Sequence, residues 1–350
     1  MTVRAPAGRK LRLRIGAHTD RLWDKPKWRR APEIVRVFPL RAPETRAASA
    51  FGGLVYIDVP RTGSGTAEVW IEGVVEAPYF VLGKTNAEEW RKEIRSRRAP
   101  WAELATRKVI LTLPARVVRE LDDPTELLRF WDGVMDACAD LATRPRERAW
   151  PERYVTDEQI SAGYMHAGYP IMTHLDAAPR FVDLARLRET GDWGMFHEMG
   201  HNHQGRDWTF RGAGEVTCNL FTLYVLETVC PGAPGHKAAG EQATRDWIEK
   251  YEAAGRDFSM WKRKPFLALV MYRQLKNAFG WEAYKKVFLG YRALPRHQRP
   301  QTDAEKRDQW LIRFSKAVGR DLGPFFESWS IPVSAEARKE VAHLPAWMPE

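Results

Sequence analysis

The sequence predicts an α+β protein, with a β-rich N-terminal subdomain over residues 1–113 and a mainly helical domain over residues 114–350. Before residue 113, short runs of β-branched and aromatic residues alternate with turn-forming residues, as is typical of strands. From Pro124 onward, apolar residues recur in steps of three and four, the spacing of amphipathic helices. These two patterns separate the chain into its predicted halves.

The N-terminal half contains several candidate strands and one helix. The predicted strands cover residues 11–15, 34–38, 53–59, 68–75 and 109–113, and a helix over 87–97 interrupts them. In the C-terminal half, Leu127, Phe130 and Trp131 begin the first helical stripe. Further helices are predicted over 245–254, 265–279, 281–291, 303–318 and 322–329, with Pro265 suited to a helix start and Gly280 to a stop.

The most informative motif is H-E-x-x-H, formed by His197, Glu198 and His201. On a helix this spacing places both imidazoles one turn apart on the same face, where they can bind one metal ion. Asp192 is a suitable N-cap for that helix, and Gly205 a suitable stop. Gly194 and Gly200 lie inside it and each costs about 1 kcal/mol relative to alanine, which indicates close approach of another group.

A third ligand is predicted at Glu215, at the start of the next helix. Zinc in hydrolases usually has three protein ligands and one position for water, so two histidines need a partner. The alternative reading of Glu215 is a carboxylate that favours the N-terminus of its helix. Asn219, one turn further, is placed to hydrogen-bond a metal-bound histidine. We therefore predict a Zn²⁺ site of His197, His201 and Glu215, with Glu198 as the general base.

These residues resemble the M60 (enhancin-like) zinc metallopeptidases. The run from Trp193 to Gln204, then Trp208 and Gly214–Phe221, is similar to the family's H-E-x-x-H, variable gap and Glu pattern. Segments 78–83, 99–104, 163–170 and 324–329 also resemble the family, so the likeness covers nearly the whole chain.

The resemblance implies a β-rich segment followed by a gluzincin-like catalytic domain. It also implies an endopeptidase that cleaves O-glycosylated, mucin-type proteins, so the expected partner is a glycoprotein substrate. Family members mostly act outside the cell, which predicts secretion or a cell-surface location. No signal peptide is recognisable at the N-terminus.

Composition agrees with this reading without proving it. The net charge of +10 favours anionic partners, but the Lys and Arg residues are spread along the chain and no nucleic-acid motif accompanies them. No apolar run is long enough to span a membrane. The three cysteines, Cys138, Cys218 and Cys230, lack the spacing of a zinc knuckle or a redox pair.

Several other polar and aromatic residues are candidates for the substrate cleft. Residues 169–173 could form an edge strand that pairs with the substrate backbone, with Tyr164, His166 and Tyr169 lining the cleft or, equally, buried in a Gly-rich turn. The remaining candidates are close to the metal motif in sequence: His203, as an oxyanion or substrate contact or at an exposed helix end, together with Trp208 and Tyr224.

Two other functional classes stay open. One is a glycoprotein-binding module with a vestigial or structural metal site, which the intact Glu198 argues against because a structural site needs no base. The other is an intracellular scaffold or regulatory protein, which the lack of a recognisable signal peptide favours.

Overall fold

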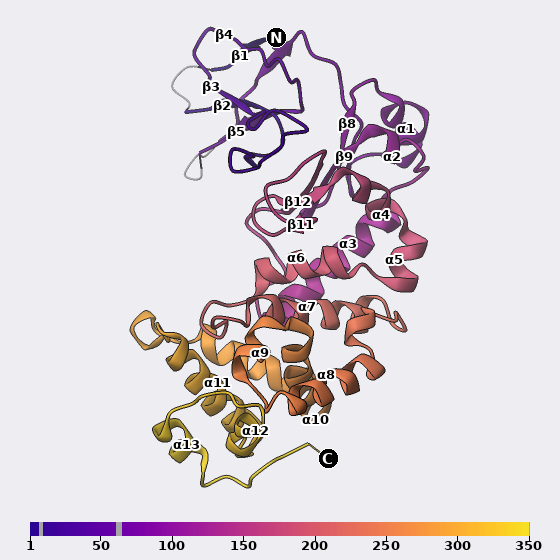
Figure 1. The fold of residues 1–350 in the computed structure, drawn as a ribbon. Helices are drawn as coiled ribbons and strands as arrows, with labels where there is room; N and C mark the ends of the chain where they lie inside the picture. The colour runs from indigo at the N-terminus through magenta and orange to yellow at the C-terminus, as the bar shows by residue number, and fades with distance from the viewer. Residues whose placement is uncertain (7–9, 61–64, 350) are drawn as a thin grey trace. The chain divides into compact units, whose positions relative to one another are not determined.

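A computed structural model describes residues 1–6, 10–60 and 65–349, in two compact units. The first unit is Met1–Asp132 with Arg148–Leu184, and the second is Gly133–Glu147 with Ala185–Glu350. Strands dominate the first and helices the second, so the predicted α+β class is confirmed (Figure 1). No helix among the described residues is long and apolar enough to cross a membrane.

The first unit contains two small antiparallel sheets at its N-terminal end. One has the order β4-β1-β6 and the other β3-β2-β5. A core of Val3, Leu13, Ile15 and Ala47 lies between partly buried hydrophobic residues of both sheets. The strands are β1 (Thr2–Arg4), β2 (Arg12–Ile15), β3 (Arg36–Pro39), β4 (Glu44–Arg46), β5 (Val55–Asp58) and β6 (Trp70–Glu72).

A six-stranded mixed sheet with the order β11-β12-β10-β9-β8-β7 forms the centre of this unit. Its helical side includes an aromatic core in which Trp131, Tyr154 and Phe181 pack together. The strands are β7 (Tyr79–Val81), β8 (Trp101–Ala105), β9 (Val109–Pro114), β10 (Glu152–Asp157), β11 (Met165–His166) and β12 (Ile171–His174). The helices are α1 (Ala87–Lys92), η1 (Ile94–Ser96), α2 (Ala115–Val118), α3 (Thr125–Leu141), which continues into the second unit, η2 (Leu175–Ala177) and α4 (Ala178–Val182).

A buried charge pair in the central sheet contacts the N-terminal sheet β3-β2-β5. Arg153 on β10 pairs with Glu103 on β8, and the Tyr56 hydroxyl on β5 donates to the same carboxylate at 2.6 Å. Thr112 donates to Glu103 at 2.8 Å, so the buried carboxylate has several partners. Since a half-satisfied buried charge is costly, this network fixes how β5 lies against the sheet.

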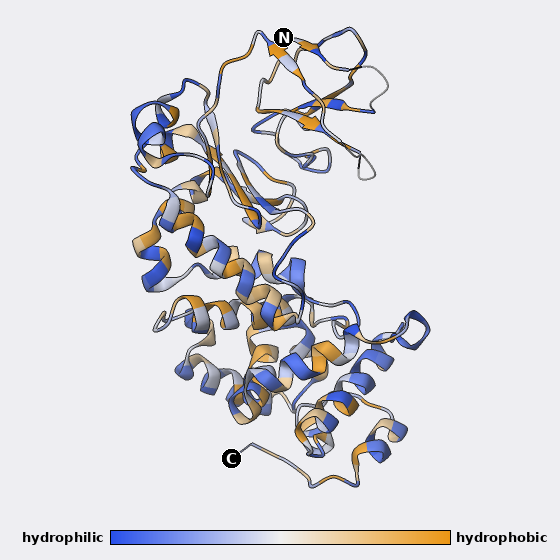
Figure 2. Cartoon of the chain, turned by 180° about the vertical axis from the view of Figure 1, so that it is seen from behind, coloured by the Kyte–Doolittle hydropathy of each residue, from blue (hydrophilic) through white to orange (hydrophobic). Residues whose placement is uncertain are grey.

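The second unit is helical apart from one isolated bridge among its described residues. Trp310 lies at the centre of an aromatic core with Tyr272, Tyr284 and Phe314. Figure 2 shows hydrophobic and hydrophilic residues interleaved along these helices, as expected of helices with one packed face. The helices are α5 (Leu184–Thr190), α6 (Trp193–His203), α7 (Gly214–Val229), η3 (Lys237–Ala239), α8 (Glu241–Ala253), α9 (Phe258–Arg263), α10 (Pro265–Arg292), η4 (Arg296–Gln298), α11 (Asp303–Val318), α12 (Gly323–Ser328) and α13 (Ala335–Val341).

The compact units divide the chain differently from the predicted boundary at 113/114. Residues 152–174 supply β10, β11 and β12 to the same sheet as β8 and β9, so strands continue well into the predicted helical half. The strand predicted over 169–173 is also not an edge strand. β12 lies between β10 and β11, and the two-residue β11 forms the edge.

Candidate metal centre

Two helices that touch at a glycine hold the predicted ligands. The Asp192 side chain accepts a hydrogen bond from the Met195 amide at 3.1 Å and starts α6, as predicted. A Cβ at Gly200 would lie 2.2 Å from the Cys218 carbonyl oxygen of α7, closer than real side chains approach backbone. Gly200 therefore allows the backbones of α6 and α7 to approach closely enough for their side chains to converge.

His197, His201 and Glu215 form a tight triangle of ligand atoms. His197 Nε2 lies 3.1 Å from His201 Nε2 and 3.1 Å from Glu215 Oε2. The third edge, from His201 Nε2 to Glu215 Oε2, is 3.4 Å. A tetrahedral metal ion with bonds of about 2.0–2.1 Å separates its ligand atoms by about 3.3–3.4 Å. The three side chains thus fit one metal ion.

Cys218 is within the same group but is oriented differently. The ligand atoms of His197, His201, Glu215 and Cys218 all lie within 4.8 Å of one another. However, the Cys218 sulfur is 3.6 Å from His197 Nδ1 and 3.8 Å from Nε2. Nearly equal distances place the sulfur beside the ring, whereas a metal would lie beyond Nε2 along its lone pair. We conclude that the geometry favours three protein ligands and leaves a fourth position open.

The electrostatics of the group attract positive charge. Burial disfavours a charged imidazole, but the neighbouring Cys218 and Glu215 outweigh it and raise the pKa of His197 to about 11 and that of His201 to about 9. The two imidazoles in turn hold the pKa of Glu215 below its usual range. A metal would therefore compete with protons here, and its binding would release them.

Asn219 contacts the first histidine of the motif. His197 Nδ1 lies 2.8 Å from Asn219 Oδ1, to which it can donate, and Asn219 Nδ2 donates to the Glu215 carbonyl at 2.8 Å. A proton on Nδ1 leaves the Nε2 lone pair for a metal. Glu198 follows His197 directly on α6, and its side chain is largely buried.

Sequence reasoning missed the contacts of the second histidine. Gln204, which follows α6, places its Nε2 2.7 Å from His201 Nδ1, and its Oε1 accepts from the Thr217 hydroxyl at 2.6 Å. The signal available in the sequence was the spacing of three residues between His201 and Gln204, which puts both on one helix face. Thr217 is two residues beyond Glu215 and could not be linked to Gln204 from spacing alone.

The side chains of His203 and Trp208 are buried in the protein core. His203 is fully buried and its Nδ1 donates to the Met199 carbonyl at 2.8 Å, so the exposed helix-end reading is wrong. Trp208 is also buried and stacks on Phe288 with ring centroids 4.4 Å apart. A Cβ at Gly205 would meet the Trp208 ring at 2.2 Å, which explains the glycine at the predicted stop.

Tyr224 lies far along α7 from Glu215. Nine residues correspond to about 13.5 Å of rise and to two and a half turns, so the two side chains leave opposite faces of the helix. The Tyr224 ring packs edge-on against Trp281 at 5.3 Å, and the Lys285 ammonium lies 5.2 Å from its centroid. The structure does not bring Tyr224 to the metal ligands.

The three predicted cleft residues of segment 163–170 belong to the first unit. Tyr164 is exposed and donates to Asp176 at 2.9 Å, while its ring stacks on His174. His166 Nε2 is 3.1 Å from the Ser161 hydroxyl, and Tyr169 is exposed. The reading of Tyr164 and Tyr169 as buried aromatics is therefore wrong, and their contact with a substrate stays a prediction.

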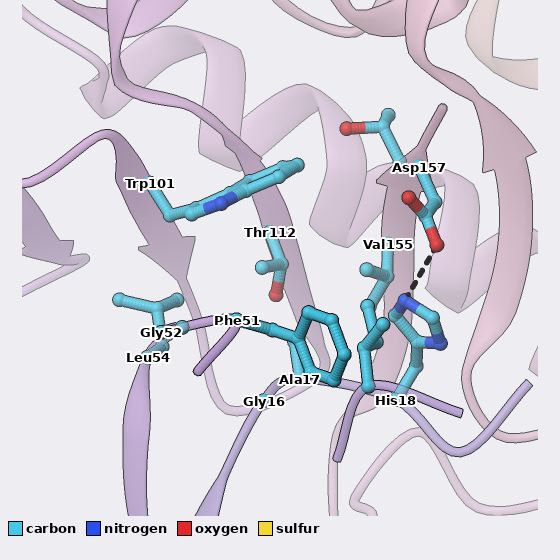
Figure 3. Close-up of a pocket in the computed structure, with 13 residues that line it drawn as sticks. Gly16, Ala17, His18, Phe51, Gly52, Leu54, Trp101, Thr112, Val155 and Asp157 are labelled. Carbon is cyan, nitrogen blue, oxygen red and sulfur yellow. Dashed lines mark ion pairs between the residues drawn. The ribbon is translucent and has the colours of Figure 1, made fainter. Parts of the chain in front are cut away.

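The first unit also contains a small pocket, with a cavity volume of about 70 Å³. Figure 3 shows Phe51 and Trp101 on its walls and an ion pair at one end, where His18 Nε2 lies 2.9 Å from Asp157 Oδ2. Arg30 Nε also lies 2.5 Å from that carboxylate oxygen. None of the residues that line the pocket is a predicted site residue, and its charged end is already paired within the protein. Among the described residues, the group of side chains that could hold a metal ion lies on α6 and α7.

Two family profiles together match most of the chain. The profile described as peptidase M60, enhancin and enhancin-like, matches residues 73–330, and that of the N-terminal domain of M60-like peptidases matches residues 1–72. A curated relative, TRPM8 channel-associated factor 2 of Bos taurus, is 42% identical over 96% of this chain. The chain spans 37% of the length of that relative.

Solved metallopeptidases share the fold. A metallopeptidase from Bacteroides thetaiotaomicron superimposes with a TM-score of 0.73 at 17% identity, covering 99% of this chain and 64% of its own. A metallopeptidase in complex with Tn antigen gives a TM-score of 0.72 at 17% identity, covering 99% of this chain and 71% of its own. At these identities the likeness establishes the architecture.

Proposed function

Because the chain belongs to the M60 peptidases, enhancin and enhancin-like, we propose that it is a zinc-dependent endopeptidase acting on O-glycosylated, mucin-type proteins. The observation that carries the proposal is the triangle of His197, His201 and Glu215, with Glu198 next to His197 in the sequence of α6. Two imidazoles and one carboxylate are the ligand set of many catalytic zinc sites, and they leave a position for water. A metallopeptidase follows from this set together with the family, and zinc is the ion that it suits best.

The catalytic step is assigned to Glu198. A bound Zn²⁺ supplies a lowered pKa for water and polarises the peptide carbonyl. Glu198 accepts the proton that the attacking water loses and later delivers it to the nitrogen of the leaving amine.

An aromatic surface beside the metal helix supports a glycosylated substrate. Trp193 lies one turn before His197 on the same face of α6. Its ring centroid lies 5.4 Å from the ring centroid of His236 and 5.8 Å from that of Phe266. Trp193 and Phe266 are partly exposed and His236 is exposed, so one face of this group can contact a sugar ring. A structural neighbour that was solved with Tn antigen supports the same substrate class.

The test compares the wild-type protein with Glu198→Gln after zinc loading. Both are incubated with a mucin-type O-glycoprotein and with its enzymatically deglycosylated form, and products are identified by mass spectrometry. We expect cuts next to glycosylated Ser or Thr by the wild type alone, with equal zinc content in both proteins. Cleavage of the deglycosylated form at the same rate would refute the glycan requirement, and equal cleavage by Glu198→Gln would refute the role of that carboxylate.

A second candidate is a glycoprotein-binding or scaffold protein whose metal site is not catalytic. The relative named as a channel-associated factor favours it. In the same experiment, full zinc content without cleavage of either substrate, but with retention of the glycoprotein by immobilised protein, would support this candidate. A peptidase of O-glycoproteins would act outside the cell or at its surface, whereas a scaffold has no such requirement.

A further inference from the structure

Each histidine of the metal centre has an amide side chain at its Nδ1 atom. Asn219 on α7 contacts His197 at 2.8 Å, and Gln204 after α6 contacts His201 at 2.7 Å. A histidine that binds a metal through Nε2 carries its proton on Nδ1, so Nδ1 must donate to an acceptor. The two amides can therefore be judged by whether they present an oxygen or a nitrogen to that proton.

The Asn219 amide is fixed in the orientation that suits a metal. Its Nδ2 donates to the Glu215 carbonyl at 2.8 Å, and a carbonyl can only accept. Its Oδ1 therefore has to face His197, where it accepts the Nδ1 proton. Turning this amide would place two acceptors against each other at one end.

The Gln204 amide has a different partner at its far end. Its Oε1 accepts from the Thr217 hydroxyl at 2.6 Å, and its Nε2 faces His201 Nδ1. In this orientation His201 accepts at Nδ1 and its proton is on Nε2, the atom that a metal needs. A hydroxyl can donate or accept, so the amide can turn over without losing either contact. Thr217 then accepts from Nε2 and still has the Ala213 carbonyl at 3.2 Å as its own acceptor.

We propose that Gln204 is a positioning residue for His201, and that Thr217 allows its amide to present either atom to the imidazole. With Oε1 turned towards Nδ1, Gln204 fixes the tautomer of His201 that offers its Nε2 lone pair to the metal. Thr217 is fully buried on α7, so this contact also ties the end of α6 to the helix that carries Glu215. The inference concerns metal binding and does not depend on the substrate proposed above.

The test measures zinc affinity by competition with a chromophoric chelator, with no substrate present. Gln204→Met keeps the length of the side chain and removes both hydrogen bonds, and we expect about 10- to 100-fold weaker zinc binding. Gln204→Glu keeps an oxygen acceptor, and we expect this variant to bind zinc within about threefold of the wild-type affinity. The matched control is Gln242→Met, because that exposed amide on α8 donates to Asp246 and accepts from Arg245, away from the metal ligands in sequence, and the zinc affinity of this variant should not change.

Three further measurements keep the test decisive. Thermal unfolding of the metal-free variants checks that zinc affinity is not lost through unfolding. Comparing the zinc affinity of Thr217→Val with that of Thr217→Ser tests the hydrogen bond between Thr217 and Gln204 while Gln204 is intact. We expect Thr217→Val alone to weaken zinc binding, and ¹⁵N spectra of the zinc-loaded wild type to show His201 protonated at Nδ1. Wild-type affinity in folded Gln204→Met, or His201 protonated at Nε2 in the zinc-loaded protein, would overturn the proposal.

Discussion

Gly200→Ala tests whether the metal centre depends on the approach of α6 to α7. The added Cβ would lie 2.2 Å from the Cys218 carbonyl oxygen and 2.9 Å from its carbonyl carbon, where real contacts are not under 3.0 Å. Both atoms belong to backbone, so the helices must separate by about 0.8 Å, the difference between 2.2 and 3.0 Å. Helix propensity alone predicts the opposite sign, a gain of about 1 kcal/mol.

The magnitude follows from how narrowly the ligand triangle is defined. Metal–ligand distances tolerate about 0.2 Å, which is less than the required separation. Since His197 and His201 are on α6 and Glu215 is on α7, the separation acts directly on two edges of the triangle, at 3.1 and 3.4 Å. We expect at least about tenfold weaker zinc binding, and a loss of about 1–3 kcal/mol in the free energy of unfolding, the usual cost of overpacking.

The assay pairs chelator competition for zinc with urea unfolding of the metal-free protein. Gly214→Ala is the matched control, because a Cβ at Gly214 has no heavy atom within 4 Å and the residue directly precedes Glu215. We expect this control to keep wild-type zinc affinity, with its free energy of unfolding unchanged or raised by up to about 1 kcal/mol. If Gly200→Ala bound zinc as tightly as Gly214→Ala with no loss of stability, the close approach of the helices would not be what positions Glu215.

Three further predictions concern Asp20, Cys218 and Trp193. Burial alone would raise the pKa of Asp20, but hydrogen bonds with His166 and Ser161 lower it to about 2. The folded-state value is depressed, so its contribution is present above about pH 4 and lost as the pH falls through 2. Asp20→Asn should therefore cost about 1–3 kcal/mol at pH 7 by urea unfolding, and a difference that did not shrink near pH 2 would contradict this. Cys218→Ala should keep zinc affinity within about threefold by chelator competition, and a loss of 100-fold would make the sulfur a ligand. Trp193→Ala should raise KM for a glycopeptide more than it lowers kcat in steady-state assays, with Tyr224→Phe as the unaffected control, and equal effects of both would remove Trp193 from the substrate surface.

Local signals in the sequence predicted the metal helix well. Asp192 caps α6 as expected, and the H-E-x-x-H spacing brings His197 and His201 together because four residues make about one turn. The closeness of Glu215 follows less directly. It requires the loop after α6 to return α7 to Gly200, and no local spacing encodes that approach.

The predictions for residues close to the metal motif in sequence failed where the rotation of a helix turns the side chain away from the metal ligands. His203 is two residues from His201, and about 100° of rotation per residue turns it to the buried side. Tyr224 is on the helix of Glu215 but leaves its opposite face. Strand β10 was missed because Glu152, Arg153 and Asp157 give it a polar pattern, although every residue in it is buried and its charges are paired across strands or loops.

The proposed reaction requires that three protein ligands leave one coordination position of the metal open. X-ray absorption spectroscopy of the zinc-loaded protein tests this most directly. We expect the zinc to be bound by nitrogen and oxygen atoms only, from His197, His201, Glu215 and one water. A sulfur atom at about 2.3 Å would identify Cys218 as a fourth protein ligand and would contradict an open catalytic site.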